Sequence, residues 1–144
     1  MDLTTSYPAS VKAQLFGIVQ LQRTIEKGKA LAHGAIGEYH YNCPMDVAVF
    51  TFLGIDHEAL LNVIKNAKSD DEINAYVKPF VEKKSASELA TWNTNWLKAS
   101  PEKGSESETY FLNLRSEVAP DRTDVTAWAD LLDLDEKRPV PVAA

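Results

Sequence analysis

The feature that most constrains the fold is a short apolar run between Pro44 and Gly54. From Met45 to Leu53, the residues are apolar on almost every side of a helical projection. Proline suits the first turn of a helix, because its missing N–H would have no partner there, and glycine suits the left-handed residue that ends one. A helix that is apolar all round has to be buried. The run therefore predicts a central buried helix.

Apolar residues elsewhere recur at helical spacing between punctuating residues. Between residues 9 and 30 the period is close to 3.6, which predicts a first helix there despite Gly17. Further helices are predicted after candidate N-cap residues and around one amphipathic face. These starts are Asp56, Ser69, Ser87, Asp124 and the face that begins with Tyr110. No pair of strands is convincing.

Together these segments predict an all-α fold, a compact single domain of six or seven short helices. A chain of 144 residues is long enough for one domain with its own core, and it needs no disulfide or metal to fold. We expect the domain to span residues 1–144. The segment from about residue 138 to 144 contains two prolines and is expected to be a loose tail.

Composition narrows the classes of function. A single cysteine excludes an internal disulfide framework and favours a reducing, cytoplasmic location. Residues 101–144 carry ten Asp and Glu against five Lys and Arg, and the net charge is −6, whereas a nucleic-acid-binding surface should be basic. No stretch approaches the roughly 18 apolar residues that a membrane helix needs, and residues 1–30 lack the apolar core of a signal peptide. We therefore predict neither nucleic-acid nor membrane binding.

The densest group of reactive side chains surrounds the only cysteine. Cys43 lies at the start of the apolar helix, where unpaired N–H groups and the helix dipole favour a thiolate. His40 could act as a base, and Asp46 could orient a partner, so these three residues are candidate catalytic residues. The alternative is that Cys43 is a small buried hydrophobe and that Asp46 only caps its helix.

Other residues are candidates for ligand contacts rather than for catalysis. Trp92 and Trp96 lie one helical turn apart and could line a groove, although core packing explains the same spacing. Asn93 is a poor helix former on the same helix, which hints at a polar contact with a loop or a partner. Glu38 could pair with Asp46 for acid–base chemistry or contact a ligand.

The histidines do not predict a metal centre. The gaps between His33, Glu38, His40 and His57 fit no familiar ligand spacing. We therefore predict no metal site and no cofactor.

The order of short motifs along the chain is similar to that of a known family. These motifs are Gly37-Glu38-Tyr39, Cys43-Pro44-Met45-Asp46, Phe52-Leu53-Gly54-Ile55-Asp56, Trp92-Asn93, Arg122-Thr123-Asp124, and Trp128 with Leu131-Leu132-Asp133-Leu134-Asp135-Glu136. From Asp2 to Glu136, the chain resembles the bacterial domain of unknown function (DUF) 5069 family. The resemblance implies a small bacterial protein with no settled activity, and it supplies no catalytic residues.

Two classes of function therefore remain open. The favoured one is a non-catalytic, cytosolic helical module that binds a small ligand or a protein partner, which could be a second copy of the chain. The alternative is a small thiol-dependent enzyme or redox sensor that uses Cys43. No complete catalytic constellation can be assembled from the spacing of residues, which favours the binding module.

Overall fold

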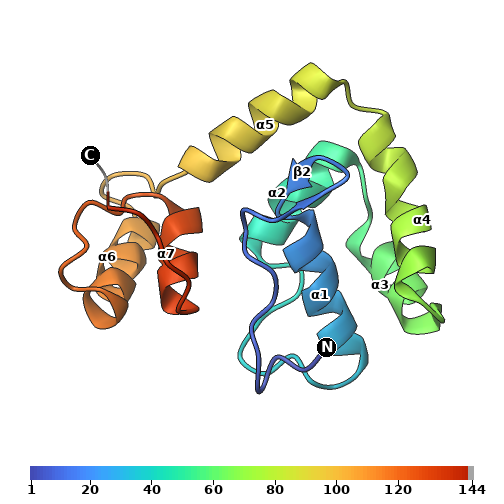
Figure 1. Cartoon of the computed structure of the whole chain (residues 1–144), viewed down its shortest axis with the longest axis horizontal. Coiled ribbons are helices and arrows are strands. Elements are labelled where there is room, and N and C mark those ends of the chain that lie inside the picture. Colours follow the sequence, from blue (N-terminus) through green and yellow to red (C-terminus); the bar gives the residue numbers. More distant parts are fainter. Residues whose placement is uncertain (143–144) are drawn as a thin grey trace.

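The computed structural model describes residues 1–142 and is mostly helical (Figure 1). Within this range, a two-stranded hairpin precedes seven helices. The elements are β1 (Gln14–Leu15), β2 (Ile18–Val19), α1 (Leu21–Ala32), α2 (Pro44–Leu53), α3 (His57–Asn66), α4 (Asp70–Glu82), α5 (Ala86–Lys98), α6 (Glu106–Val118) and α7 (Trp128–Asp135). The predicted helical class, with six or seven short helices, is confirmed.

The helices form two lobes with separate hydrophobic cores (Figure 1). The first lobe, residues 1–82, contains the hairpin and α1 to α4, and its core includes Leu21 and Val49. The second lobe, residues 106–138, contains α6 and α7, which pack through Phe111 and Leu131. The yellow helix α5 spans the top of Figure 1 and contacts β2 on one side and α7 on the other. The two cores are therefore joined by the bridging helix α5 and by the contacts between α7 and the first lobe.

The first helix predicted over residues 9–30 is wrong in its first half. Leu15 instead pairs with Ile18 across a hairpin turn, in which Phe16 and Gly17 have φ values of 55° and 86°. A tight hairpin needs positive φ at both turn positions, which glycine adopts at little cost. Apolar residues three positions apart share one face of a helix, but they also pair across such a turn. Their spacing therefore could not distinguish the two structures.

Helix α2 begins and ends where the sequence predicts. Pro44 is its first residue, and Gly54 follows its last with a left-handed φ of 78°. Val49 and Leu53 are buried in the core of the first lobe, whereas Val47 on the opposite face is 44% exposed. The expectation of a helix buried all round therefore holds for one face only. The middle of the lobe is occupied by α1, which contacts α2, α3 and β1.

The helix starts were predicted with mixed success. Asp56 caps α3 as predicted, because its side chain accepts a hydrogen bond from a backbone N–H of the first turn. Ser69 also precedes its helix as predicted, although its side chain makes no capping bond. The prediction that Ser87 caps a helix is wrong, because α5 is capped by Ser85 in a reciprocal capping box. The prediction that Asp124 caps the last helix is also wrong, because α7 begins only at residue 128.

The segment predicted to be a loose tail makes defined contacts in its described part. The Arg138 guanidinium donates a hydrogen bond to the Pro8 carbonyl, and the Arg122 guanidinium donates one to the Val140 carbonyl at 2.9 Å. Residues 143 and 144 lie outside the described residues.

Candidate functional site

The site is built on a stripe of buried polar side chains along α1. Gln20, the residue before α1, lies three and four residues before Arg23 and Thr24, and Lys27 follows these two by four and three residues, so the four side chains share one face. None of the four is more than 4% exposed. Buried polar groups are costly unless they are hydrogen-bonded, so each of these side chains must have partners from other elements.

The first set of partners converges on Asp46 in the first turn of α2, which is fully buried. Its Oδ2 atom lies 2.8 Å from Lys27 Nζ and accepts the Cys43 backbone N–H at 3.2 Å. Its Oδ1 atom accepts hydrogen bonds from the Thr24 hydroxyl and, at 3.3 Å, from the Gln20 amide. The Asp46 carboxylate thus forms an ion pair with Lys27, and its hydrogen bonds hold the start of α2 against α1 and the residue before it.

Cys43 lies at the edge of this network and is half-buried. The Lys27 ammonium donates to the Cys43 Sγ at 3.3 Å and to the His40 carbonyl at 2.9 Å. The His40 imidazole is exposed and makes no hydrogen bond or ion pair within residues 1–142. Of the predicted catalytic residues, Cys43 and Asp46 therefore lie side by side, but the group next to the sulfur is Lys27 rather than the imidazole. Asp46 also performs the capping role that was the structural alternative.

A second buried cluster connects the two lobes. The Arg23 guanidinium donates to both oxygens of Glu136, at 2.8 Å and 2.7 Å, and Glu136 is only 4% exposed. The Tyr39 hydroxyl donates to the same carboxylate at 2.6 Å, and Arg138 donates to it as well. A bidentate pair of this kind fixes both the distance and the orientation of its partners. Glu136 at the end of α7 is therefore locked onto α1.

The charges in this cluster set each other's protonation states. Burial alone would raise the pKa of Glu136, but the hydrogen bonds and charge of Arg23, with Tyr39 and Arg138, hold it below its ordinary value. Burial opposes the charge of Arg23, yet Glu136 raises its pKa overall. Burial and the nearby Glu136 raise the pKa of Tyr39. The carboxylate is thus ionised and the phenol protonated at neutral pH.

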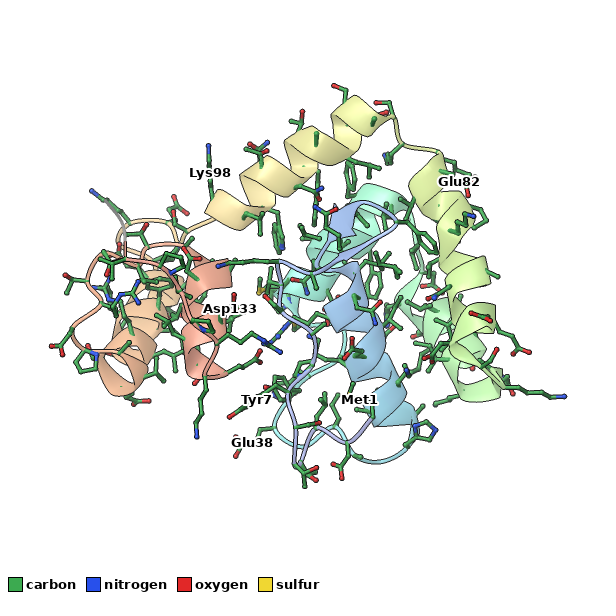
Figure 2. All side chains as sticks on the ribbon, viewed as in Figure 1. Met1, Tyr7, Glu38, Glu82, Lys98 and Asp133 are labelled. Atoms are coloured by element: carbon green, nitrogen blue, oxygen red, sulfur yellow. The ribbon has the colours of Figure 1, made fainter. Side chains whose placement is uncertain are left out.

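Further contacts between the lobes are also polar. The Ser10 hydroxyl donates to Asp133 at 2.6 Å, and Lys12 Nζ lies 2.6 Å from Asp130 and 3.3 Å from Asp133. Figure 2 shows Asp133 on the side of α7 that faces the first lobe. The contacts between the lobes are therefore largely hydrogen bonds and ion pairs.

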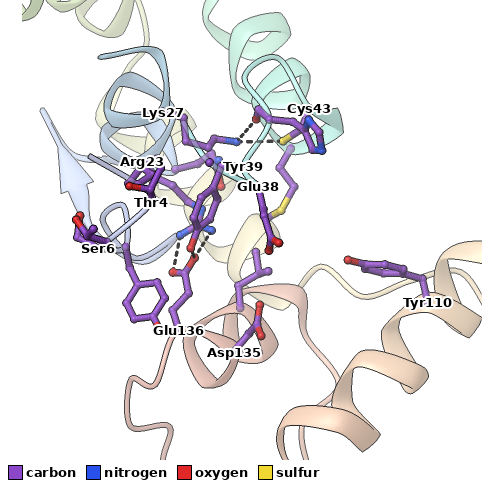
Figure 3. A pocket seen from close by; sticks show the side chains of 18 residues that line it. Thr4, Ser6, Arg23, Lys27, Glu38, Tyr39, Cys43, Tyr110, Asp135 and Glu136 are labelled. Atoms are coloured by element: carbon purple, nitrogen blue, oxygen red, sulfur yellow. Dashed lines mark hydrogen bonds and ion pairs between the residues drawn. The ribbon is translucent and has the colours of Figure 1, made fainter. Parts of the chain in front are cut away.

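A pocket of about 850 Å³ opens between the lobes beside these clusters (Figure 3). Its walls come from the N-terminal segment, α1, the loop before α2, the first turn of α2, α6 and α7. The residues that line it are Leu3, Thr4, Thr5, Ser6, Tyr7, Gln20, Arg23, Lys27, Gly37, Glu38, Tyr39, His40, Cys43, Met45, Tyr110, Leu132, Asp135 and Glu136. The pocket brings three predicted residues together, namely Glu38, His40 and Cys43, while Asp46 supports it from behind.

The predicted residues of α5 lie elsewhere. Trp92 stacks between Phe52 and Trp96, with ring centroids 5.2 Å apart on each side. Asn93 donates to the Gly17 carbonyl at 2.8 Å and accepts the Val19 N–H at 3.0 Å, so it holds the hairpin onto α5. The polar contact of Asn93 is therefore with the hairpin, and its predicted role in ligand binding stays a prediction. A shallower hollow of about 340 Å³ adjoins Trp92 between α5 and Phe52 of α2.

The sequence reasoning missed Arg23, Lys27, Tyr39 and Glu136. A signal for the first two was present, because polar residues at helical spacing alternate with the apolar face of α1. They could be taken for a solvated face, and only tertiary contacts reveal that they are buried. No local pattern marks Glu136, whose partner Arg23 lies 113 residues earlier in the chain.

Two broader features of the described chain bear on function. Among residues 1–142, no three His, Cys, Asp or Glu side chains are placed to hold a metal ion. Within the same range, no single helix is long and apolar enough to cross a membrane. Helices α2 and α3 reach that length and apolar content only when they are taken together, and the pair is bent by 94°.

Comparison with known proteins identifies one relationship. The family described as "Domain of unknown function (DUF5069)" matches residues 5–138. A search of the curated proteins finds no match to the chain. The match covers both lobes, the buried clusters and most of the pocket.

Proposed function

This chain belongs to the DUF5069 family, and because that family has no known function, we propose one from its pocket: the protein binds a small molecule between its two lobes. The observation that carries this proposal is the pocket of about 850 Å³, which lies within the usual size range of ligand sites. A concave site also favours a small ligand over a protein partner, which would need a broader surface. The single cysteine and the family resemblance support a cytosolic, bacterial setting.

The arrangement of the lobes supports the same proposal. Ligand sites occur preferentially where two structural units meet. Here the units have separate cores and are joined by ion pairs such as Arg23–Glu136. The buried networks hold the floor of the pocket in place, and the ion pair between Arg23 and Glu136 fixes α7 beside it.

We expect a bound ligand to raise the melting temperature of the protein, because it binds the folded state alone. The measurement is a thermal-shift screen against a library of metabolites, followed by titration calorimetry of each hit. The variant Met45→Trp places a large ring in the pocket and should abolish binding. The matched control Val47→Trp lies on the exposed face of the same helix, outside the pocket, and should bind as the wild type does. Hits that bind Met45→Trp unchanged would contradict the proposed site.

A second candidate function, thiol chemistry, is favoured by one contact. Cys43 Sγ lines the pocket and lies 3.3 Å from the buried Lys27 ammonium, at the N-terminus of α2. A cation and a helix N-terminus both stabilise a thiolate. This reading makes the pocket a site in which the sulfur can reach a bound electrophile.

We expect Cys43 to react with iodoacetamide in the folded protein, because the thiol is half-exposed and faces the pocket. Replacing Lys27 with methionine should slow the reaction severalfold by removing the cation beside the sulfur. The rate is measured by mass spectrometry, with Lys29→Met as the control on the same helix. A reaction that requires denaturant, or one that is equally fast in Lys27→Met, would remove the support for thiol chemistry.

A further inference from the structure

The buried cations of the pocket already have anionic partners within the protein. The ammonium of Lys27 has three acceptors, which are the Asp46 carboxylate, the His40 carbonyl and the Cys43 sulfur. An ammonium group has three N–H donors, so none of them remains for a ligand. The Arg23 guanidinium forms its bidentate pair with Glu136 and also donates to the Ala9 carbonyl. The floor of the pocket is therefore balanced in charge, because each of these buried cations is paired with a buried carboxylate.

The charges that remain at the pocket are negative. Glu38 and Asp135 are both exposed, and within residues 1–142 neither carboxylate makes a hydrogen bond or an ion pair. Figure 3 shows Glu38 extending from the loop before α2 and Asp135 extending from α7 toward the same space, with the Tyr110 hydroxyl directed to it from α6. Burial and the neighbouring Glu136 raise the pKa of Asp135, and the more distant charge of Arg23 only partly opposes this.

The uncharged walls of the pocket are suited to an organic body. Tyr7, Tyr39 and Tyr110 line it together with Met45 and Leu132. Aromatic faces attract cations through the ring quadrupole, and Arg23 already lies over the Tyr39 ring at 5.7 Å. Tyr7 and Tyr110 are 44% and 63% exposed, so their rings are accessible to a ligand.

We propose that the ligand is a small organic cation, an alkylammonium or quaternary ammonium compound, held between the carboxylates of Glu38 and Asp135 with its apolar body against the tyrosines. This inference rests on the proposed function and names the ligand class of the same pocket. The two carboxylates come from different lobes, so the cation also bridges them. The positive charge of the ligand compensates the two carboxylates, neither of which forms an ion pair within residues 1–142.

The test compares cations with neutral molecules of the same shape. Titration calorimetry is carried out with choline and its neutral carbon analogue 3,3-dimethylbutan-1-ol, and with a series of alkylamines and the corresponding alcohols. We expect each cation to bind at least about tenfold more tightly than its neutral analogue. The double variant Glu38→Gln/Asp135→Asn should weaken the binding of the cations by about tenfold and leave the neutral compounds unaffected.

A charge-matched control separates local contacts from the overall field. Glu58→Gln/Asp71→Asn removes the same charge from the exposed first turns of α3 and α4, away from the pocket, and should leave cation binding within about twofold of the wild type. Equal affinities for cations and neutral analogues, or equal losses in the two double variants, would overturn the proposal. A lysine peptide that binds more tightly than every free amine would also overturn it, because the source of the cation would then be a protein.

The result also distinguishes failure of the ligand class from failure of the proposed function. A neutral or anionic compound whose binding is abolished by Met45→Trp would preserve the pocket as a binding site and refute the cation. If no compound in the metabolite library binds in a manner sensitive to Met45→Trp, both proposals fail.

Discussion

Replacing Asp46 with alanine is expected to lower the free energy of unfolding by about 3–5 kcal/mol. The substitution leaves the Lys27 ammonium buried without its counter-charge. It also removes the acceptor of the Thr24 hydroxyl and of the Gln20 amide. An unpaired buried charge and unsatisfied donors are among the most destabilising changes a single substitution can make. The measurement is urea-induced unfolding monitored by tryptophan fluorescence.

The control for this prediction is an ion pair made by Lys29, which lies on α1 as Lys27 does. Lys29 Nζ lies 2.8 Å from Asp70, whose side chain is 72% exposed. Asp70→Ala should therefore cost no more than about 1 kcal/mol. In addition, Asp46→Ala combined with Lys27→Met should be less destabilising than the sum of the two single changes, because the double variant buries no unpaired charge. A loss below about 1 kcal/mol in Asp46→Ala would show that the network is dispensable for stability.

Replacing Glu136 with glutamine is expected to lower the free energy of unfolding by about 3–5 kcal/mol at neutral pH. The buried Arg23 guanidinium would lose its charged partner, and α7 would lose its main attachment to α1. Glu106→Gln, an exposed carboxylate in the first turn of α6, is the control and should change stability by less than about 1 kcal/mol.

The effect of Glu136 should depend on pH in a defined direction. The pKa of its carboxyl group lies below the ordinary value of 4.5 in the folded protein. An acid whose pKa is lowered on folding stabilises the protein above its unfolded pKa, and this contribution is lost as pH falls through the folded value. The wild type should therefore lose stability below about pH 4.5, and the difference from Glu136→Gln should shrink there. Unfolding curves recorded between neutral and acidic pH check this, and a difference that stays constant on acidification would contradict the assigned pairing.

Much of the helical framework could be predicted because its signals are local. Pro44 and Gly54 mark the ends of α2, and Asp56 caps α3, as the conformational preferences of these residues require. The hairpin was missed because the pair Leu15 and Ile18 satisfies both a helical face and a cross-strand pair. The hairpin is held in place by the Asn93 side chain on the distant helix α5, which hydrogen-bonds the backbone of the hairpin.

The candidate site was predicted only in part, for a related reason. The segment from Glu38 to Asp46 was recognised from its density of reactive side chains, and the structure brings three of its predicted residues to the pocket. Lys27 was not recognised, although it is the group that contacts the cysteine sulfur. A lysine on a helix normally faces solvent, and no pattern within one helix indicates whether another segment covers it.

By itself, the sequence determined that this protein is helical, where several of its helices begin and end, and that its only cysteine lies at the start of an apolar helix. Those properties follow from backbone preferences and from apolar spacing, which act over a few residues. Only the tertiary structure decided which polar side chains are buried and which charges meet. The strength of the Lys27–Asp46 and Arg23–Glu136 pairs depends on burial and on distances between segments far apart in the chain, so their role in shaping the pocket exists only in the folded molecule.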